Sequence, residues 1–134
     1  MAYFADADPN LSRFHQMAQA AIDGFPTAFR SAACNVVVQI TDWPPKDVLG
    51  DLGITNPADL TGLYEGIPLP LKSVSDPAPL PDMVWLFREP ILNEWRARGD
   101  IALADLVADV TVHEFAHHFG WSDADIARID RWWE

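Results

Sequence analysis

With 134 residues, the chain is long enough for one domain with a hydrophobic core, which we place at residues 1–134, and too short for two. Apolar residues make up 49% of it, a share that excludes an intrinsically disordered chain. Its 20 acidic and 9 basic residues give a net charge of −11, so the surface repels phosphate groups, and nucleic acid and membranes are poor partners.

The first residues and the cysteine content bear on the compartment. Residues 1–8 lack the basic start and the apolar stretch of a secretory signal. No apolar run approaches the roughly 20 residues of a membrane span. The one cysteine, Cys34, leaves no partner for an internal disulfide, and we interpret it as a small buried hydrophobic residue. These features lead us to expect a cytoplasmic protein.

The first predicted element is an amphipathic helix over Asn10–Ile22. Its apolar residues recur at helical spacing, and Asn10 or Ser12 has the side chain of an N-cap. Gly24 and Pro26 follow, and both residue types are typical of a helix end. We therefore expect the helix to stop before them.

Two strands, one helical turn and a loop are predicted next. Asn35–Thr41 (NVVVQIT) is rich in β-branched side chains and is followed by two prolines, so we expect a buried strand. Asp47–Leu52 predicts one helical turn. Thr61–Ile67 (TGLYEGI) predicts a weaker strand, and its two glycines and the prolines after it indicate a sheet edge. Residues 68–81 hold five prolines and predict a loop.

A third strand and a helix follow the loop. The short apolar run Met83–Arg88 (MVWLFR) predicts the strand. Pro90 is expected to open the helix, because proline fits the first helical turn, and Gly99 is expected to break it after about Arg98.

Two more helices complete the chain. Asp100 is predicted to cap a long helix over Ile101–Phe119, and Gly120 is predicted to end it in a left-handed turn. Ser122 then caps a last helix that runs to the C-terminus. Strands and helices are segregated along the chain, which predicts an α+β fold with a small sheet instead of a doubly wound sheet.

The long predicted helix changes character along its length. At about 100° per residue, its first half carries an apolar stripe formed by Leu103, Leu106, Val107 and Val110. Three polar residues, His113, Glu114 and His117, continue that stripe in the second half. A second apolar face consists of Val112, Phe115 and Phe119. A helix that is apolar on two sides is expected to be central and well buried.

His113, Glu114 and His117 form the pattern H-E-x-x-H. The two histidines lie one turn apart, so their ring nitrogens can converge on one metal ion. Glu114 lies about a quarter-turn away and can face that ion through a water molecule as a general base. The alternative is two core histidines bonded to backbone, with Glu114 in an ion pair. That alternative must bury three polar groups on an apolar stripe, a cost that a metal ion removes.

A zinc site that keeps one position open needs a third protein ligand, and Asp123 is the candidate. Gly120 lets the chain reverse, and Asp123 follows it by three residues, so the pattern extends to HEFAHHFGWSD. The alternative role for Asp123 is an acid in the first turn of the last helix, where the helix dipole favours it. The rival third ligands are Glu65, Asp82 and His15, none of which has supporting spacing.

The run His113–Asp123, preceded by the segments GLYEGIPLPL and MVWLFREPIL, resembles the small bacterial zincin-like metallopeptidases, also called minimal zincins. The resemblance extends from about Val36 to the last predicted helix, and its most specific part is H-E-x-x-H-x-x-G-x-x-D. It implies a compact α+β fold with a small mixed sheet packed on the active-site helix, and it implies peptide-bond hydrolysis. The roles that it implies are zinc ligation by His113, His117 and Asp123 and base catalysis by Glu114.

The mechanism that follows is zinc-assisted hydrolysis of a peptide or protein substrate. Zinc (Zn²⁺) lowers the pKa of its bound water and polarises the scissile carbonyl, and Glu114 moves the proton from that water to the leaving amine. Tyr64 is the candidate oxyanion donor, because no His or Tyr follows Asp123; packing under the proline-rich loop is its alternative role. The strand that holds Tyr64 could also pair with an extended peptide at the sheet edge.

Two further side chains near the motif have open roles. His118 points about 100° away from His117 and about 140° away from His113, so it does not share the ion. We expect it to be hydrogen-bonded at the helix end, with a contact to a ligand or to substrate as the alternative. Asp109 lies one turn before His113 and can orient its far ring nitrogen; a solvated acid is the alternative.

The alternative function, from a different class, is a non-catalytic zinc-containing protein-interaction domain. The small size and the lack of a clear oxyanion donor favour it. Glu114 favours the enzyme, because a purely structural zinc site needs no base there. A storage site for another divalent metal is a third alternative and the weakest, because only one site is visible.

Overall fold

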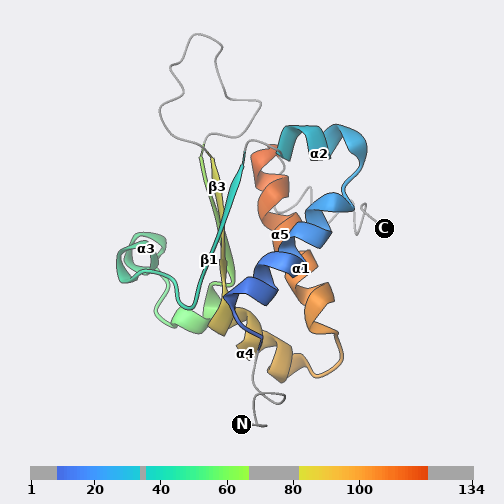
Figure 1. Cartoon of the computed structure of the whole chain (residues 1–134). Helices are drawn as coiled ribbons and strands as arrows, with labels where there is room; N and C mark the ends of the chain where they lie inside the picture. The colour runs from blue at the N-terminus through green and yellow to red at the C-terminus, as the bar shows by residue number, and fades with distance from the viewer. Residues whose placement is uncertain (1–8, 34–35, 67–81, 121–134) are drawn as a thin grey trace.

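The computed structural model describes residues 9–33, 36–66 and 82–120. In chain order its elements are α1 (Leu11–Asp23), α2 (Thr27–Ala33), β1 (Val37–Thr41), α3 (Lys46–Leu52), the 3₁₀ turn η2 (Pro57–Asp59), β2 (Gly62–Glu65), β3 (Met83–Phe87), α4 (Arg88–Arg98) and α5 (Leu103–His118). Helices α1 and α5 pack together on one side of the strands, and α3 lies beyond the strands (Figure 1). Within the described ranges, no helix is long and apolar enough to cross a membrane.

The strands form one three-stranded sheet with the order β1-β3-β2. β1 runs parallel to β3, with Val37 paired to Met83, and β2 runs antiparallel to β3, with Gly62 paired to Leu86. The sheet is therefore small and mixed, which confirms the predicted α+β fold. β2 lies at an edge of this sheet, as its glycines indicated.

The prediction that the first strand is buried was wrong. β1 begins two residues later than predicted and lies at the other edge of the sheet, where only Ile40 is buried and Val37 is 38% exposed. β3 takes the central position, and its residues Val84 and Leu86 are buried. A β-branched composition favours a strand, whereas burial depends on the strand's place in the sheet, which composition does not encode.

Helix α1 agrees with the prediction. The Asn10 side chain accepts a hydrogen bond from the backbone N–H of Arg13 at 2.9 Å, and Gly24 caps the other end.

The short helix α2 was not predicted, because proline is typical of a helix end. Proline also suits a helix beginning, and the Pro26 carbonyl accepts the N–H of Phe29 at 2.9 Å.

Two helix beginnings differ from the predicted ones. α4 starts directly after β3, two residues before Pro90, so this proline lies in the first turn, where its missing N–H costs nothing. Ala102 is the N-cap of α5 instead of Asp100, and no side chain caps this end. The helix ends agree with the prediction, because Gly99 and Gly120 have φ values of 69° and 92°.

Helix α3 confirms the predicted turn at Asp47–Leu52. Three other predictions fall outside the described residues: the loop at residues 68–81, the burial of Cys34, and the last helix from Ser122 onward. They stay predictions.

Helix α5 is buried on both of its predicted apolar faces. Phe25 packs edge-on against Phe115, with ring centroids 5.5 Å apart, and Phe29 lies 4.9 Å from Phe119. Each such ring contributes about 1.5–3 kcal/mol when it is fully buried. This packing fixes the position of α5. The polar side chains lie on its remaining side, which faces β2.

Candidate metal centre and active site

His113 and His117 lie one helical turn apart on α5, and both are half-buried. Their ring centroids are 5.0 Å apart, with 75° between the ring planes. Two imidazole nitrogens about 2.0–2.1 Å from a tetrahedral zinc ion place their ring centres roughly 5 Å apart. The spacing of the two rings therefore fits two ligands of one zinc ion.

Glu114 is half-buried, and its side chain lies against Gly62 of β2. A Cβ atom at Gly62 would lie 3.0 Å from Cγ of Glu114 and 2.9 Å from Cγ1 of Val110. Both distances are shorter than an ordinary van der Waals contact, so glycine lets the strand pass this close to the helix. The edge strand and the candidate base consequently border the same space.

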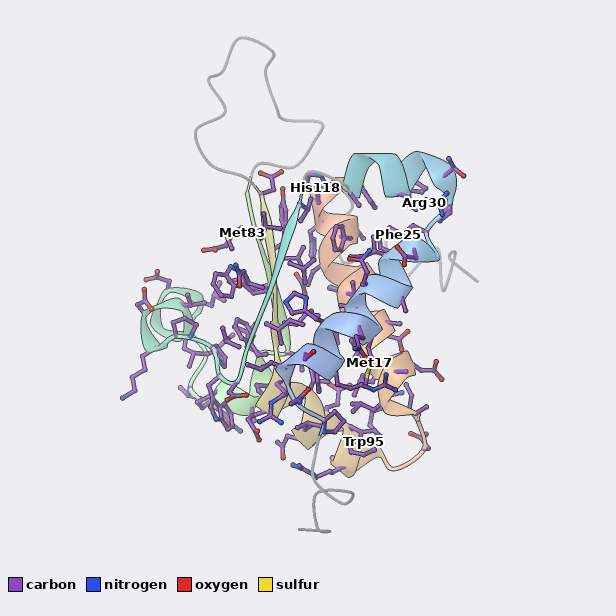
Figure 2. All side chains as sticks on the ribbon, viewed as in Figure 1. Met17, Phe25, Arg30, Met83, Trp95 and His118 are labelled. Carbon is purple, nitrogen blue, oxygen red and sulfur yellow. The ribbon has the colours of Figure 1, made fainter. Side chains whose placement is uncertain are left out.

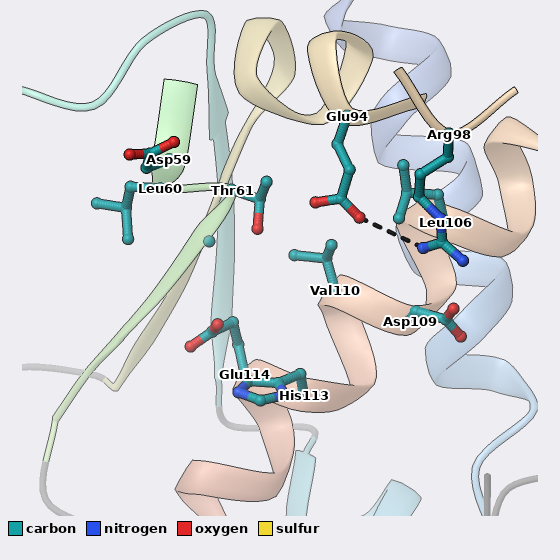
Figure 3. A pocket seen from close by; sticks show the side chains of 11 residues that line it. Asp59, Leu60, Thr61, Glu94, Arg98, Leu106, Asp109, Val110, His113 and Glu114 are labelled. Carbon is teal, nitrogen blue, oxygen red and sulfur yellow. Dashed lines mark hydrogen bonds and ion pairs between the residues drawn. The ribbon is translucent and has the colours of Figure 1, made fainter. Parts of the chain in front are cut away.

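A cavity of about 340 Å³ opens beside His113 and Glu114. Figure 3 shows it between α5, the segment that leads into β2, and the end of α4. Its volume lies within the range of ligand pockets, roughly 300–1,000 Å³. The remaining lining residues are Asp59, Leu60, Thr61, Gly62, Glu94, Arg98, Leu106, Asp109 and Val110.

A second polar cluster is formed by Tyr64, Asp82 and His118. The Tyr64 hydroxyl donates to Oδ2 of Asp82 at 3.1 Å and lies 3.1 Å from Nδ1 of His118, which is 3.0 Å from the same carboxylate oxygen. Asp82 is 7% and His118 2% exposed. Figure 2 shows His118 at the last turn of α5, beside the strands. Burial, with the charge and the hydrogen bond of Asp82, raises the pKa of Tyr64 far above its ordinary value. The hydroxyl therefore keeps its proton.

In the described part of the chain, none of the rival third ligands forms a metal-binding group with the two histidines. Asp82 belongs to the second cluster, Glu65 accepts a hydrogen bond from Nε1 of Trp85 at 2.7 Å, and His15 is exposed on α1. In residues 9–33, 36–66 and 82–120, no three metal-ligating side chains converge. Asp123 lies outside these ranges, so its role as the third ligand stays a prediction.

The bonds that join Tyr64, Asp82 and His118 were not predicted from the sequence. Tyr64 is 18 residues from Asp82 and 54 from His118, and no periodicity connects such positions. The sequence did contain one indication of this cluster. A histidine on a buried face of a helix, such as His118, must find a polar partner. The oxyanion role of Tyr64, and the role of Asp109 as a partner of His113, stay predictions; Asp109 and His113 line the same cavity.

Comparison with known protein families gives a match over most of the chain. The family model for zincin-like metallopeptidases matches residues 33–133, which extend from before β1 to beyond α5 and include Tyr64, His113, Glu114, His117 and Asp123. No curated protein matches the chain significantly.

Proposed function

The chain belongs to the zincin-like metallopeptidase family, and from this premise we propose that it is a zinc-dependent peptidase with Glu114 as its general base. One observation carries the proposal. The rings of His113 and His117 lie 5.0 Å apart on one helix, and Glu114 between them in sequence lines a cavity. A structural zinc site needs ligands only, whereas hydrolysis needs ligands, a base and room for the substrate.

The proposed zinc ligands are His113, His117 and Asp123. Gly120 supports the proposed role of Asp123, because its positive φ turns the backbone directly after α5. Because a carboxylate is negatively charged, it would offset part of the charge of the ion. When bound, zinc would lower the pKa of a water molecule and polarise the scissile carbonyl.

Glu114 would take the proton of the attacking water and deliver it to the leaving amine. The close passage of β2 at Gly62 keeps its side chain beside the cavity. The oxyanion role predicted for Tyr64 is the alternative to a structural one, because its hydroxyl is bonded to Asp82 and lies beside His118. To reach a substrate, this hydroxyl would have to turn away from Asp82 and His118.

The proposed substrate is an extended peptide bound along β2. Among the described strands β2 lies at the sheet edge, and extended peptides pair with such edges through backbone hydrogen bonds. The cavity wall carries one guanidinium group, that of Arg98, and more carboxylates than this group can balance. We therefore expect a basic substrate side chain to be favoured there. The carboxylates are those of Asp59, Glu94, Asp109 and Glu114.

Metal content and digestion of a peptide library test this proposal together. Protein purified without added metal should contain about one zinc ion per chain. It should cleave peptides, and Lys or Arg should be enriched over Asp or Glu beside the cleaved bond. Protein with zinc but without cleavage would support the protein-interaction domain instead. Protein that binds no zinc would contradict both functions.

A further inference from the structure

We propose that Tyr64, Asp82 and His118 form a positioning unit that fixes the metal-binding turn of α5 against the sheet. The inference rests on the proposed zinc site at His113 and His117. No member of the unit is a ligand in that proposal. The unit acts through the backbone, by setting the direction in which His117 points.

The unit joins three segments that are distant in sequence: Tyr64 is in β2, Asp82 directly precedes β3, and His118 ends α5. Their polar atoms lie 3.0–3.1 Å from one another, and Asp82 and His118 are buried. Inside a protein such hydrogen bonds are stronger than in water, and breaking them leaves polar groups without solvent. The last turn of α5 therefore cannot rotate or slide without disrupting bonds in the interior.

The backbone that follows β2 leaves room for the unit. Gly66 has a φ of 152°, a conformation that other residues rarely adopt. A Cβ atom there would lie 2.6 Å from Cγ of Asp82 and 2.9 Å from the hydroxyl oxygen of Tyr64. Any side chain at Gly66 would collide with Asp82 and Tyr64, so glycine lets the chain pass directly against these two members of the unit.

Aromatic packing holds the same end of the helix on another side. The ring of Phe119 lies 4.9 Å from that of Phe29 and 6.3 Å from that of Phe25. Apolar packing keeps the turn against its neighbours, but it is not directional. The hydrogen bonds of His118 are directional, so they are the contacts that fix the rotation of the turn.

Rotation of the turn matters because His117 immediately precedes His118. The two side chains point about 100° apart around the helix axis, so a fixed His118 also fixes His117. In this orientation the ring of His117 lies 5.0 Å from that of His113. Ligands that are held in place before the ion arrives bind it more tightly. Loss of the unit should therefore weaken zinc binding.

A comparison of Tyr64→Phe with Thr111→Val tests the proposal. Each variant loses one hydroxyl, and the Thr111 hydroxyl donates to the Val107 carbonyl at 2.7 Å on the same helix, away from the unit. We expect Tyr64→Phe to weaken zinc affinity about tenfold and Thr111→Val to leave it nearly unchanged. Competition with a chelator measures the affinity, and the visible absorption of the cobalt(II) protein reports the ligand geometry.

A second pair of variants separates bonding from space filling. His118→Asn keeps a polar nitrogen near the position of Nδ1, whereas His118→Leu fills the space without a hydrogen bond. The proposal expects the asparagine variant to bind zinc more tightly than the leucine variant. The reverse order, or equal losses in Tyr64→Phe and Thr111→Val, would overturn it.

The readouts also keep this inference distinct from the proposed activity, because zinc affinity and the cobalt spectrum need no peptide. A wild-type chain that binds zinc and cleaves no peptide counts against the peptidase alone. Normal zinc binding with slow hydrolysis in Tyr64→Phe would overturn the positioning unit and support Tyr64 as the oxyanion donor.

Discussion

Helix α5 contributes to two groups of polar side chains that differ in their surroundings. The open group consists of His113, Glu114 and His117. The closed group consists of Tyr64, Asp82 and His118. The open group is half-buried, and two of its members line a cavity, whereas the closed group is bonded to itself between helix and sheet. The same residue types can thus serve chemistry where they face a cavity and hold the structure where they face one another.

Strand β2 and the glycine directly after it touch both groups. Gly62 lies against Val110 and Glu114 at the open group, and four residues later Gly66 lies against Asp82 and Tyr64 at the closed group. A change at the first glycine should disturb the chemistry, and a change at the second should disturb the fold. Substitutions in the two groups can break this division.

Glu114→Gln should abolish most hydrolysis and keep the zinc. Gln is nearly isosteric with Glu but cannot accept the proton of the attacking water, and a general base typically contributes about 10²–10⁴-fold. Zinc content and the rate of peptide cleavage measure the two effects, with His113→Ala as the control that should lose the metal. If Glu114→Gln loses zinc as fully as the control, Glu114 is a ligand or a structural support.

Asp123→Ala should weaken zinc binding by more than about 100-fold, the upper end of the loss expected from partners outside the ligand shell. The reason is that removal of a ligand opens the coordination sphere itself. Asp125→Ala is the matched control, with the same change of charge two residues away, and should bind zinc as the wild type does. Equal affinities in the two variants would overturn Asp123 as the third ligand.

The sequence predicted the open group better than the closed one for a physical reason. His113, Glu114 and His117 are local in one helix, so helical geometry alone places them together. Tyr64 and His118 meet across 54 residues, and only the packed fold brings them into contact. Short spacing can be read from sequence, whereas a contact between distant segments depends on the whole arrangement of helix and sheet.

The fold shows the same limit. The strands and the ends of α4 and α5 could be predicted, because composition and glycine act locally. The burial of β1 could not, since it depends on β3 entering the centre of the sheet. The N-cap of α5 was assigned to Asp100 from its side chain, but the helix begins later, after Ala102.

Gly66→Ala should destabilise the protein by about 1–3 kcal/mol, because it combines an unfavourable φ with a collision against the closed group. Gly62→Ala should reduce peptide cleavage and also cost some stability, because the added methyl group would lie 3.0 Å from Cγ of Glu114 and 2.9 Å from Cγ1 of the buried Val110. Gly50→Ala is the control, since a Cβ atom there has no neighbour within 4 Å. Urea denaturation and cleavage rates separate the three variants. A larger loss of stability at Gly62 than at Gly66 would contradict the division.

The smallest predicted effect concerns the stability of the closed group at alkaline pH. Burial and Asp82 raise the pKa of Tyr64 in the folded state, whereas the unfolded chain loses this proton near pH 10. Because the folded state favours the protonated hydroxyl, Tyr64 contributes fully to folding stability below about pH 10. This contribution is lost as the pH rises further. Tyr64→Phe has no proton to lose at this position, so its stability should decline less over the same range.

Near pH 11 the wild type should have lost at most about 1 kcal/mol more folding free energy than Tyr64→Phe, because the half-buried ring is partly screened by solvent. Urea denaturation of the metal-free proteins at about pH 9 and about pH 11 measures it. The other ionisable groups are common to both chains, so they cancel in the comparison. A parallel decline of the two proteins would mean that Tyr64 loses its proton as easily in the fold as in the unfolded chain. The group around Asp82 and His118 would then be accessible to solvent, and the distinction from the open group would fail.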